Sequence, residues 1–424
     1  MKFVLASYGA RGDVEPCAVV GRELLRRGHE VRIAVSPDVV GFAESAGLAA
    51  VAYGPDSQSV LEDDSLLNFW KDFPRNLGNL RELNRLRRET KELFTECWGE
   101  MSATLTSLAD GADLLISGPV FEQQAANVGE YYDIPLATLH TWPTRVNGHL
   151  IPILPSPLMR SAMAGLEWLH WRETKRVEDA QRRELGLPET KAPSPRRMTR
   201  RGSLEIQAYD EVCFPGLAAE WAKWHDQRPF VGTLTLQLAT DADDEVTSWI
   251  AAGTPPIYFG FGSIPVDSPA DTLAMIGAAC AQLGERALVC SGWSDFSGLP
   301  DFDHVKVVRT ANHAAVFPAC SAVVHHGGAG TTAAGLRAGV PTLILWTLPD
   351  HQIWGAQIKR LMVGTTRRFS GTTRESLVAD LRTILSPQCV TRAREIATRM
   401  TEPATSVATT ADLIEEKAGL RRVG

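Results

Sequence analysis

The sequence feature that most constrains the fold is the stretch VVHHGGAGTT at residues 323–332. Apolar residues up to Val324 are typical of a buried parallel strand, and the small residues from Thr331 to Ala338 predict a helix that ends at Gly339. A glycine turn that opens a helix leaves backbone N–H groups without partners, and the helix dipole adds partial positive charge there. The stretch therefore predicts an anion site suited to a diphosphate.

The donors at this predicted site are both backbone and side-chain groups. The N–H groups of Gly328, Ala329 and Gly330 fall in the first helical turn, and His326 and the Thr331 hydroxyl can donate to phosphate oxygens. The alternative is a tight strand-to-helix turn with a core histidine. Two adjacent histidines before a run of small residues favour the phosphate site.

Composition excludes several classes of protein. The 424 residues are enough for two domains, and a net charge of −7 argues against a nucleic-acid binder. Seven cysteines are scattered and never form a CxxC pair, so we expect neither a disulfide framework nor a zinc site. We therefore expect a cytoplasmic protein with no metal and no cofactor, and a monomer by default.

Membrane contact is expected to be peripheral at most, at the inner face of the plasma membrane. No apolar run reaches the length of a membrane span, and the amino terminus lacks the apolar core of a signal peptide. Arg196, Arg197, Arg200 and Arg201 form a basic cluster, which is typical of a solvated surface. The alternative interpretation is that this cluster contacts anionic lipid.

The amino-terminal residues predict a βαβ unit. Residues 3–7 form a strand, a helix follows the turn at residues 9–13, and residues 31–35 form the next strand. A dinucleotide-binding domain is the rival interpretation. The turn lacks the third glycine of GxGxxG, and Ser36-Pro37 follows the second strand where an acidic residue is expected, although Asp38 lies close by.

Asp13 has two interpretations in this turn. An aspartate at a helix start caps free N–H groups. The carboxyl end of a parallel strand also points into the crevice where α/β proteins bind ligands, and a carboxylate there can take a proton from an acceptor hydroxyl. The residues alone leave these two roles open.

The acceptor side is less clearly marked. Residues 57–98 form a charged, helix-prone insertion that is either a flap over an apolar substrate or part of the core. His140 ends a predicted strand and is the second candidate for the base, although a satisfied residue of the cleft wall is the more usual role. Trp142 is one of several tryptophans between residues 140 and 225 that suit either packing or an apolar acceptor cleft.

A second βα series begins after the predicted linker at residues 215–230. We expect one doubly wound domain over residues 1–214 and another over 231–424, facing each other across a cleft, with the last helix able to pack back on the first domain. Turns at Ser263, at Asn312 and at residues 326–331 follow strands of one parallel sheet and should converge. Asp350 and His351 follow a further strand, where a carboxylate suits sugar hydroxyls and helix capping is the plainer role.

With these motifs in place, the chain resembles family 1 glycosyltransferases of the GT-B fold, in the branch of the glycopeptide-antibiotic and sterol enzymes. The resemblance rests on GARGDVEP at residues 9–16, GFGS at 260–263, and HHGGAGTT at 325–332 with AGVP at 338–341. Residues 39–57 and 203–223 look most like mycobacterial glycosyltransferases of glycopeptidolipids. The motifs extend over nearly the whole chain.

The resemblance implies roles for the matching residues. Asp13 corresponds to the base that activates the acceptor, and Asp350 to the acid that binds the donor sugar. The usual Asp-Gln pair reads Asp350-His351 here, which leaves the donor sugar open between a TDP-deoxysugar, such as rhamnose or 6-deoxytalose, and a UDP-hexose. The remaining implied donor-site residues are Arg11, Gly12, Ser263, Thr310, Ala311, Asn312, His326, Gly328, Ala329, Gly330 and Thr331.

These assignments predict an inverting, metal-independent transfer to a hydroxyl of a lipopeptide or another hydrophobic acceptor. Asp13 would take the hydroxyl proton, while N–H groups, His326 and the helix end would stabilise the diphosphate. Two alternatives belong to other classes. One is a protein that binds nucleoside diphosphates without transferring sugar, and the other is a nicotinamide oxidoreductase.

Overall fold

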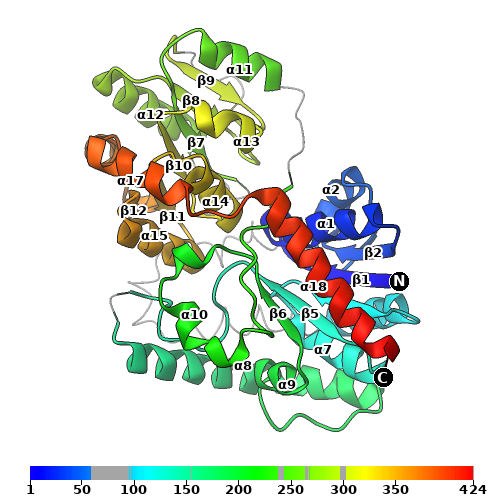
Figure 1. The fold of residues 1–424 in the computed structure, drawn as a ribbon. Coiled ribbons are helices and arrows are strands. Elements are labelled where there is room, and N and C mark those ends of the chain that lie inside the picture. Colours follow the sequence, from blue (N-terminus) through cyan, green and yellow to red (C-terminus); the bar gives the residue numbers. More distant parts are fainter. Residues whose placement is uncertain are drawn as a thin grey trace. The chain divides into compact units, whose positions relative to one another are not determined.

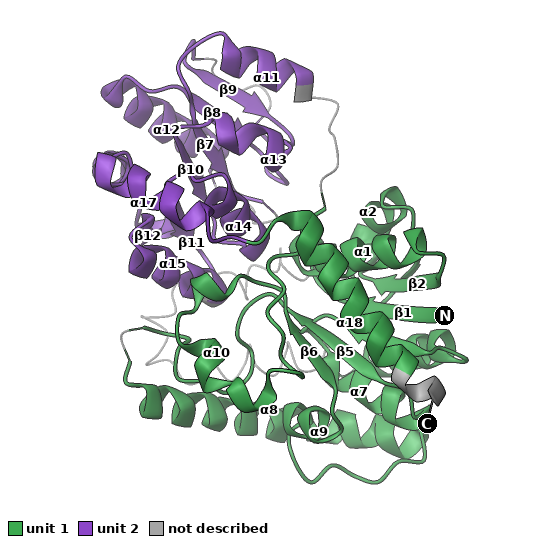
Figure 2. Cartoon of the chain, viewed as in Figure 1, with its two compact units in different colours: residues 1–236, 401–424 green, residues 237–400 purple. Residues whose placement is uncertain are grey.

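The computed structural model describes residues 1–58, 95, 97–152, 154–236, 243–262, 266, 268–296 and 302–423 of the chain. The chain divides into two compact units, unit 1 of residues 1–236 with 401–424, and unit 2 of residues 237–400 (Figure 2). Each unit is an α/β structure built on its own parallel sheet (Figure 1). Most of the predicted 57–98 insertion lies outside the described residues.

Unit 1 contains a six-stranded sheet in the order β3-β2-β1-β4-β5-β6, with every neighbouring pair parallel. Strands β1, β4 and β5 are almost wholly buried, which explains why their sequences are nearly continuous apolar runs. The elements of unit 1 are β1 (Lys2–Ser7), α1 (Arg11–Arg26), β2 (Glu30–Val35), α2 (Val40–Ser45), β3 (Ala49–Ala52), β4 (Leu114–Ser117), α7 (Glu122–Tyr131), β5 (Leu136–His140), α8 (Ser156–Glu184), α9 (Ser194–Arg200), β6 (Leu204–Gln207), α10 (Leu217–Glu220) and α18 (Pro403–Val423).

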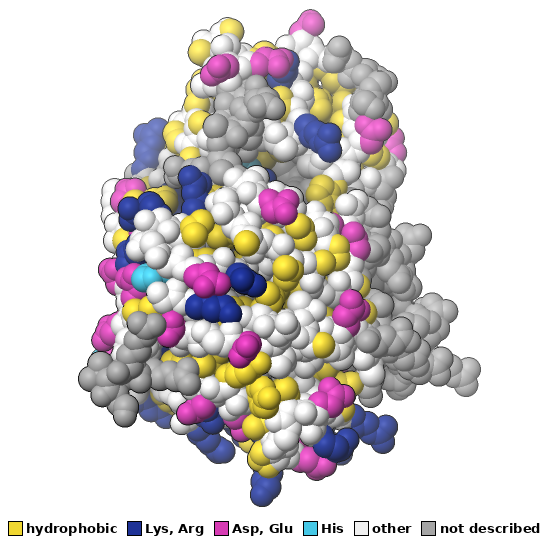
Figure 3. All heavy atoms as spheres, turned by 90° about the vertical axis from the view of Figure 1, so that its right-hand side faces the viewer, with side chains coloured by type: hydrophobic (Ala, Val, Ile, Leu, Met, Phe, Trp, Pro, Cys, Tyr) yellow, Lys and Arg dark blue, Asp and Glu magenta, His cyan; other side chains and the backbone are white. Residues whose placement is uncertain are grey.

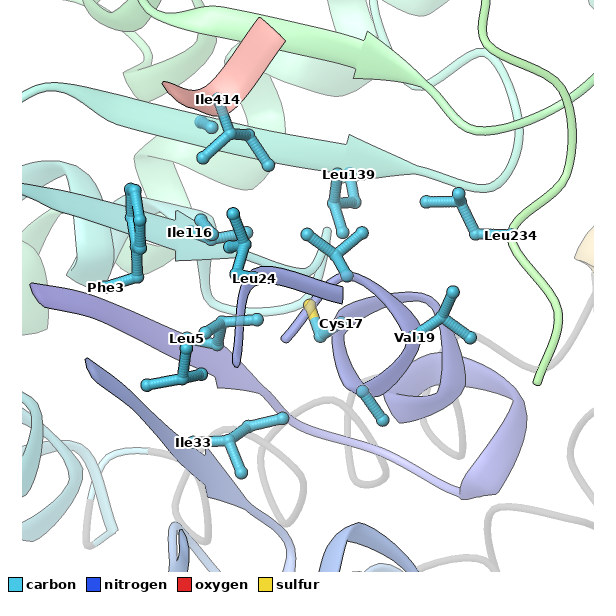
Figure 4. Packing of buried hydrophobic residues seen from close by; sticks show 14 of the residues in the cluster. Phe3, Leu5, Cys17, Val19, Leu24, Ile33, Ile116, Leu139, Leu234 and Ile414 are labelled. Carbon is cyan, nitrogen blue, oxygen red and sulfur yellow. The ribbon is translucent and has the colours of Figure 1, made fainter. Parts of the chain in front are cut away.

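One face of the unit 1 sheet is covered by α1 and the last helix, α18. Cys17 and Leu24 of α1 and Ile414 of α18 join the strand residues in one buried cluster (Figure 4). Arg27, which follows α1, donates to the carboxylates of Asp412 and Glu415 at 2.7 and 2.5 Å. The final helix therefore belongs to unit 1, although 164 residues of unit 2 precede it in the chain.

Unit 2 repeats the same architecture, with the order β12-β11-β10-β7-β8-β9 and all pairs parallel. Its core is formed by apolar residues of β7, β8, β10 and β11 against α12 and α16. The elements of unit 2 are α11 (Asp243–Ala251), β7 (Ile257–Gly260), α12 (Pro269–Leu283), β8 (Ala287–Cys290), β9 (Val305–Val308), α13 (His313–Val316), β10 (Ala322–His325), α14 (Ala329–Arg337), β11 (Thr342–Trp346), α15 (Pro349–Leu361), β12 (Gly364–Arg368), α16 (Arg374–Ile384) and α17 (Pro387–Ala397).

The strand order places one switch point in each sheet. In unit 1 the chain reverses its direction of progress between β1 and β4, and in unit 2 between β7 and β10. Open parallel sheets bind ligands outside the carboxyl ends of the strands at such points. Asp13 lies in the first turn of α1, directly after the turn that follows β1, and His326 lies in the turn after β10, so the fold places both residues at switch points.

Residues 215–230, expected to link the domains, lie within unit 1. Trp221 is 1% exposed there, and the Arg228 guanidinium stacks over the rings of Trp221 and Trp224. This packing holds the stretch against unit 1, and the change of unit comes after Leu236.

On the face of the molecule in Figure 3, acidic, basic and hydrophobic side chains are interspersed.

Candidate functional site

The turn after β10 is shaped by His325 and Gly327. The N–H of Gly327 donates to Nδ1 of His325 at 3.0 Å, which leaves the ring proton on Nε2. Gly327 has a φ of +109°, and a Cβ on it would lie 2.9 Å from Cβ of His351 and from Cγ2 of Ile344. Only glycine satisfies both constraints, so this position is fixed by conformation and by space.

The turn delivers the chain to the amino terminus of α14, with Gly328 as its N-cap residue and no side-chain cap. The first intrahelical bond runs from Thr332 N–H to the Gly328 carbonyl, so α14 supplies no acceptor for the N–H groups of Ala329, Gly330 and Thr331. Gly328, Ala329, Gly330 and Thr331 are all partly exposed. The predicted donor groups are therefore accessible at the positive end of the helix dipole.

His326 is held between two glycines. A Cβ on Gly262, in the turn after β7, would come 2.5 Å from Cε1 of His326, and a Cβ on Gly328 would come 2.7 Å from Nε2. Burial, reinforced by His351, lowers the pKa of His326 to about 3. The ring is therefore neutral near pH 7 and acts as a neutral donor or acceptor beside the helix terminus. The role of Gly262 was not foreseen, because a close approach between two turns leaves no local pattern.

Asp350 and His351 begin α15 and differ sharply in exposure. The Asp350 side chain is 51% exposed, whereas the His351 side chain is 7% exposed. Nδ1 of His351 accepts from the Leu348 N–H at 3.4 Å, and its ring meets the His326 ring edge to face at 4.9 Å between centroids. Burial lowers the pKa of His351 to about 4. Asp350 is thus open to a ligand, while His351 supports the turn from beneath.

The turn after β9 contains Thr310, Ala311 and Asn312. Thr310 is exposed, Ala311 is half-buried, and Asn312 caps α13 by accepting from the Ala314 N–H at 3.2 Å. Strand β9 lies three positions from β10 in the sheet, which corresponds to about 14 Å. The turn therefore lies at the same edge of the sheet as the glycine turn, at a distance from it. Ser263 falls outside the described residues.

Asp13 in unit 1 has the capping role considered for it. Its Oδ2 accepts from the Ala10 N–H at 3.0 Å, so it caps the start of α1. The side chain is half-buried at the switch point. Gly9 has a φ of +128°, and a Cβ there would lie 2.4 Å from Oδ2 of Asp13. The glycine therefore makes room for this carboxylate.

Arg11 and Gly12 are exposed in the first turn of α1. The Arg11 guanidinium lies 3.6 Å from Glu15 and stacks over the Phe42 ring at 4.8 Å. A Cβ on Gly12 would meet no described atom within 4 Å. The contacts within unit 1 thus leave half of the Arg11 side chain open to solvent.

His140 lies inside unit 1. It is fully buried, with Nε2 at 3.2 Å from Glu122 and Nδ1 at 3.4 Å from Gln207. Burial, together with the nearby Arg145, lowers its pKa. These contacts argue against direct contact between His140 and an acceptor, because the ring has no exposed surface. Trp142, two residues later, is half-buried and keeps part of its ring accessible.

Comparison with known proteins places the chain in a family. It is 64% identical over 421 residues to a glycosyltransferase of Mycobacterium tuberculosis, Rv1524, covering 99% of each chain. The chain belongs to the family 1 glycosyltransferases. Residues 267–418 match the family described as erythromycin biosynthesis protein CIII-like, C-terminal domain. The chain is also 28% identical to the sterol 3-beta-glucosyltransferase UGT80B1 of Arabidopsis thaliana, over 94% of this chain and 65% of that protein.

Solved structures of other glycosyltransferases have the same fold as this chain. The kitacinnamycin glycotransferase aligns with a TM-score of 0.72 at 18% identity, over 98% of this chain and 99% of that one. The glycosyltransferase VinC in complex with DTDP aligns with a TM-score of 0.66 at 18% identity, over 99% and 100%. The spinosyn rhamnosyltransferase SpnG aligns with a TM-score of 0.66 at 16% identity, over 97% and 100%. The two six-stranded parallel sheets are thus those of the GT-B fold.

Proposed function

We propose that this glycosyltransferase transfers a hexose or deoxyhexose from a nucleoside diphosphate sugar to a hydroxyl of a hydrophobic acceptor, with inversion and without a metal ion. The observation that carries the proposal is the open amino terminus of α14 at a switch point, with the neutral His326 ring fixed beside it. Backbone N–H groups and the helix dipole there can compensate the charge of a leaving diphosphate.

The donor would extend along the carboxyl edge of the unit 2 sheet. The diphosphate would bind the N–H groups of Ala329, Gly330 and Thr331, and the nucleoside would reach toward Thr310 and Asn312. Half-exposed Asp350 would accept hydrogen bonds from the sugar hydroxyls. Ser263 and Arg11 would complete the phosphate contacts.

In the proposed chemical step, Asp13 is the base. Asp13 would take the proton of the acceptor hydroxyl while its oxygen forms a bond to the anomeric carbon. The bond from that carbon to the diphosphate oxygen would break on the opposite face, which inverts the anomeric configuration. Because the Ala10 N–H orients the Asp13 carboxylate, little reorganisation would be needed for proton transfer.

The choice of sugar and nucleotide is supported only by related proteins. VinC has a structure with DTDP, and SpnG is named a rhamnosyltransferase. These neighbours favour a TDP-deoxysugar such as TDP-rhamnose or TDP-6-deoxytalose. The plant relative is named a glucosyltransferase, which favours a UDP-hexose as the second candidate. The same relative acts on a sterol by its name, which supports a hydrophobic acceptor such as a glycopeptidolipid-type lipopeptide.

Two measurements test this proposal. Calorimetry should detect binding of TDP or UDP, and radiolabel from the matching sugar nucleotide should appear in a mycobacterial lipid extract, with or without EDTA. Asp13→Asn should keep nucleotide affinity and lose transfer by about a thousandfold, because the amide still accepts from Ala10 but takes no proton. Transfer by Asp13→Asn at the wild-type rate would rule out the base, and no nucleotide binding would rule out the donor site.

A further inference from the structure

The first half of α8 exposes large apolar side chains over several turns. Leu158, Leu166, Trp168 and Leu169 are 62%, 65%, 50% and 37% exposed, and Leu154 just before the helix is 41% exposed. Only Met159 and Met163 of this half are buried. Five large apolar side chains are thus exposed within sixteen residues. Contiguous exposed apolar patches of this kind mark sites of interaction with a partner or a membrane.

The same part of the chain carries positive charge in an acidic protein. Residues 154–201 contain eleven Lys and Arg against six Asp and Glu, a formal net charge of +5, while the rest of the chain carries −12. Exposed Arg172 and Arg176 continue the outer side of α8 beyond the apolar residues. Glu167 lies within the apolar half, but its carboxylate is 13% exposed and paired with Arg196 at 2.8 Å. The exposed charged side chains between residues 170 and 176 are Arg172, Glu173 and Arg176, so this part of the face carries two positive charges and one negative charge.

The helix is fixed to unit 1 through its other side. In its second half, buried Gln181 and Arg182 bond to Asn127 of α7, with Arg182 also paired to Glu130 at 2.9 Å. In its first half, Arg160 pairs with Glu220 at 2.7 Å. These contacts hold α8 against the rest of unit 1 and leave its apolar face exposed, and α8 runs along the outer side of unit 1 in Figure 1.

Trp168 and Arg172 place an apolar ring and a positive charge next to each other on this face. The Arg172 guanidinium lies over the Trp168 indole ring at 5.1 Å from its centroid. Tryptophan prefers the interface between lipid headgroups and acyl chains, and arginine pairs with lipid phosphates. From Leu158 to Arg176 the helix extends for about 27 Å, long enough to lie along a membrane surface.

We propose that the exposed face of α8, residues 154–176, docks on the surface of a bilayer containing anionic phospholipid, with the leucines and Trp168 at the acyl boundary and Arg172 and Arg176 at the phosphates. None of the helices among the described residues has the length and apolarity needed to cross a bilayer. The proposal does not depend on the donor or the acceptor assigned above. It gives this glycosyltransferase a direct approach to acceptors that reside in a membrane.

The competing occupant is a second copy of the chain. Two α8 faces brought together would oppose two segments of residues 154–176 that each carry a formal net charge of +2, and this repulsion between like charges disfavours the pairing. An anionic bilayer instead complements that charge and covers the same leucines. Charge therefore favours the lipid surface over self-association.

Flotation of the full-length protein with vesicles tests the proposal. Vesicles of phosphatidylcholine alone are compared with vesicles containing one part phosphatidylglycerol in three. Leu166→Gln with Trp168→Gln should weaken binding to the anionic vesicles at least about tenfold. Arg172→Gln with Arg176→Gln should weaken it by about fivefold for each charge and reduce its salt dependence. Leu25→Gln with Tyr131→Gln, at unit 1 side chains that are 41% and 47% exposed, is the matched control and should bind as the wild type does.

Two further measurements separate the outcomes. Thermal unfolding and TDP or UDP affinity should be unchanged in the α8 variants, because these side chains are exposed and lie in unit 1. Equal vesicle binding by wild type and the Leu166 and Trp168 variant would overturn the proposal, as would no binding of wild type to anionic vesicles. A wild-type dimer that the same substitutions dissociate, without vesicle binding, would assign the face to self-association instead.

Discussion

The imidazole rings of His326 and His351 meet edge to face, with 4.9 Å between their centroids. His351 stands where the family resemblance leads one to expect a glutamine that contacts the donor sugar. Its side chain is 7% exposed and lies beneath the glycine turn, in contact with the histidine proposed to serve the diphosphate. The position after Asp350 therefore acts on the turn, and Asp350 alone of the pair faces outward.

This relationship predicts different effects at the two positions. His351→Gln removes the ring that supports His326, so it should raise KM for every sugar nucleotide by a similar factor, roughly three- to tenfold. Asp350→Asn removes a charged acceptor of sugar hydroxyls, so it should change the ratio of kcat/KM between TDP-rhamnose and UDP-glucose. Steady-state kinetics with both donors provides the test. A changed sugar ratio in His351→Gln would assign His351 to the sugar after all.

The three histidines around the turn predict acid sensitivity of unit 2. Burial holds the pKa of His325 well below its usual value, that of His326 near 3 and that of His351 near 4. The unfolded chain binds protons at these groups below about pH 6.5 and the folded chain does not. The free energy of unfolding should therefore fall as the pH drops from about 6.5 to 4, by up to about 1.4 kcal/mol per pH unit for each histidine.

Urea unfolding of the full chain at pH 7 and pH 5 measures this loss. His351→Gln lacks one of the three titrating groups, so its stability should depend less steeply on pH than that of the wild type. Identical pH dependence in the two proteins would show that His351 takes up no proton on unfolding in this range.

The sequence predicted most of this fold because parallel strands buried on both sides are continuous apolar runs. Strands β1 and β2, expected at residues 3–7 and 31–35, lie at Lys2–Ser7 and Glu30–Val35, and β5 ends at His140 as expected. Two edge strands were not predicted. Strand β3 is short and mostly exposed, and β12, with the sequence GTTRR, is half-buried along its whole length. Strands β3 and β12 are not buried on both faces and therefore have no continuous apolar run. They are recognised as strands only through their hydrogen bonds to the neighbouring strand.

The site was predictable where backbone chemistry defines it and not where distant residues meet. The glycine turn and Asp13 follow from local patterns of strand, glycine and helix start. The contact of Gly262 with His326 and the burial of His140 beside Glu122 join residues from separate turns, for which one sequence has no signal. Arg197 is similar. It was grouped with a solvated basic cluster, yet its side chain is 15% exposed and pairs with Glu130 and Glu178.

The close fit of His326 against Gly328 predicts a selective effect on the diphosphate. Gly328→Ala would place a Cβ 2.7 Å from Nε2 of His326, so the ring must move away from the helix terminus. The φ of Gly328 is −59°, which alanine adopts freely, so folding should be little affected. We expect calorimetric affinity for TDP or UDP to fall by about tenfold. Gly371→Ala, where a Cβ meets nothing within 4 Å, is the control in the same unit.

A substitution at Gly9 should affect the proposed base, Asp13, and leave nucleotide binding unchanged. Gly9→Ala would force Oδ2 of Asp13 away from its position and also strain a backbone with a φ of +128°. We expect kcat to fall by at least about tenfold while nucleotide affinity stays the same, because the change lies in unit 1. Gly41→Ala in α2, with no atom within 4 Å of the added Cβ, should leave kcat within about twofold. Unchanged kcat in Gly9→Ala would remove the support for Asp13 as the oriented base.

Unit 1 contains a buried ionic cluster in which two arginines pair with two carboxylates. Arg145 donates to both oxygens of Glu122 at 2.7 and 3.0 Å and to Glu205 at 3.1 Å, and Arg228 donates to Glu205 at 2.8 Å. Burial alone would raise the pKa of Glu122, but Arg145 and His140 hold it at about 2. Both carboxylates are therefore ionised, and they depend on the arginines.

Arg145→Met tests this dependence. It would leave Glu122 and Glu205 as buried charges without their shared partner, so we expect a loss of about 3–5 kcal/mol in the free energy of unfolding. Arg26 makes a similar two-bond contact with Glu23 at 2.7 and 2.8 Å, but its side chain is 72% exposed. Arg26→Met should therefore leave the unfolding transition nearly unchanged. Urea unfolding followed by tryptophan fluorescence compares the two variants, and equal effects would mean that burial does not set the strength of these pairs.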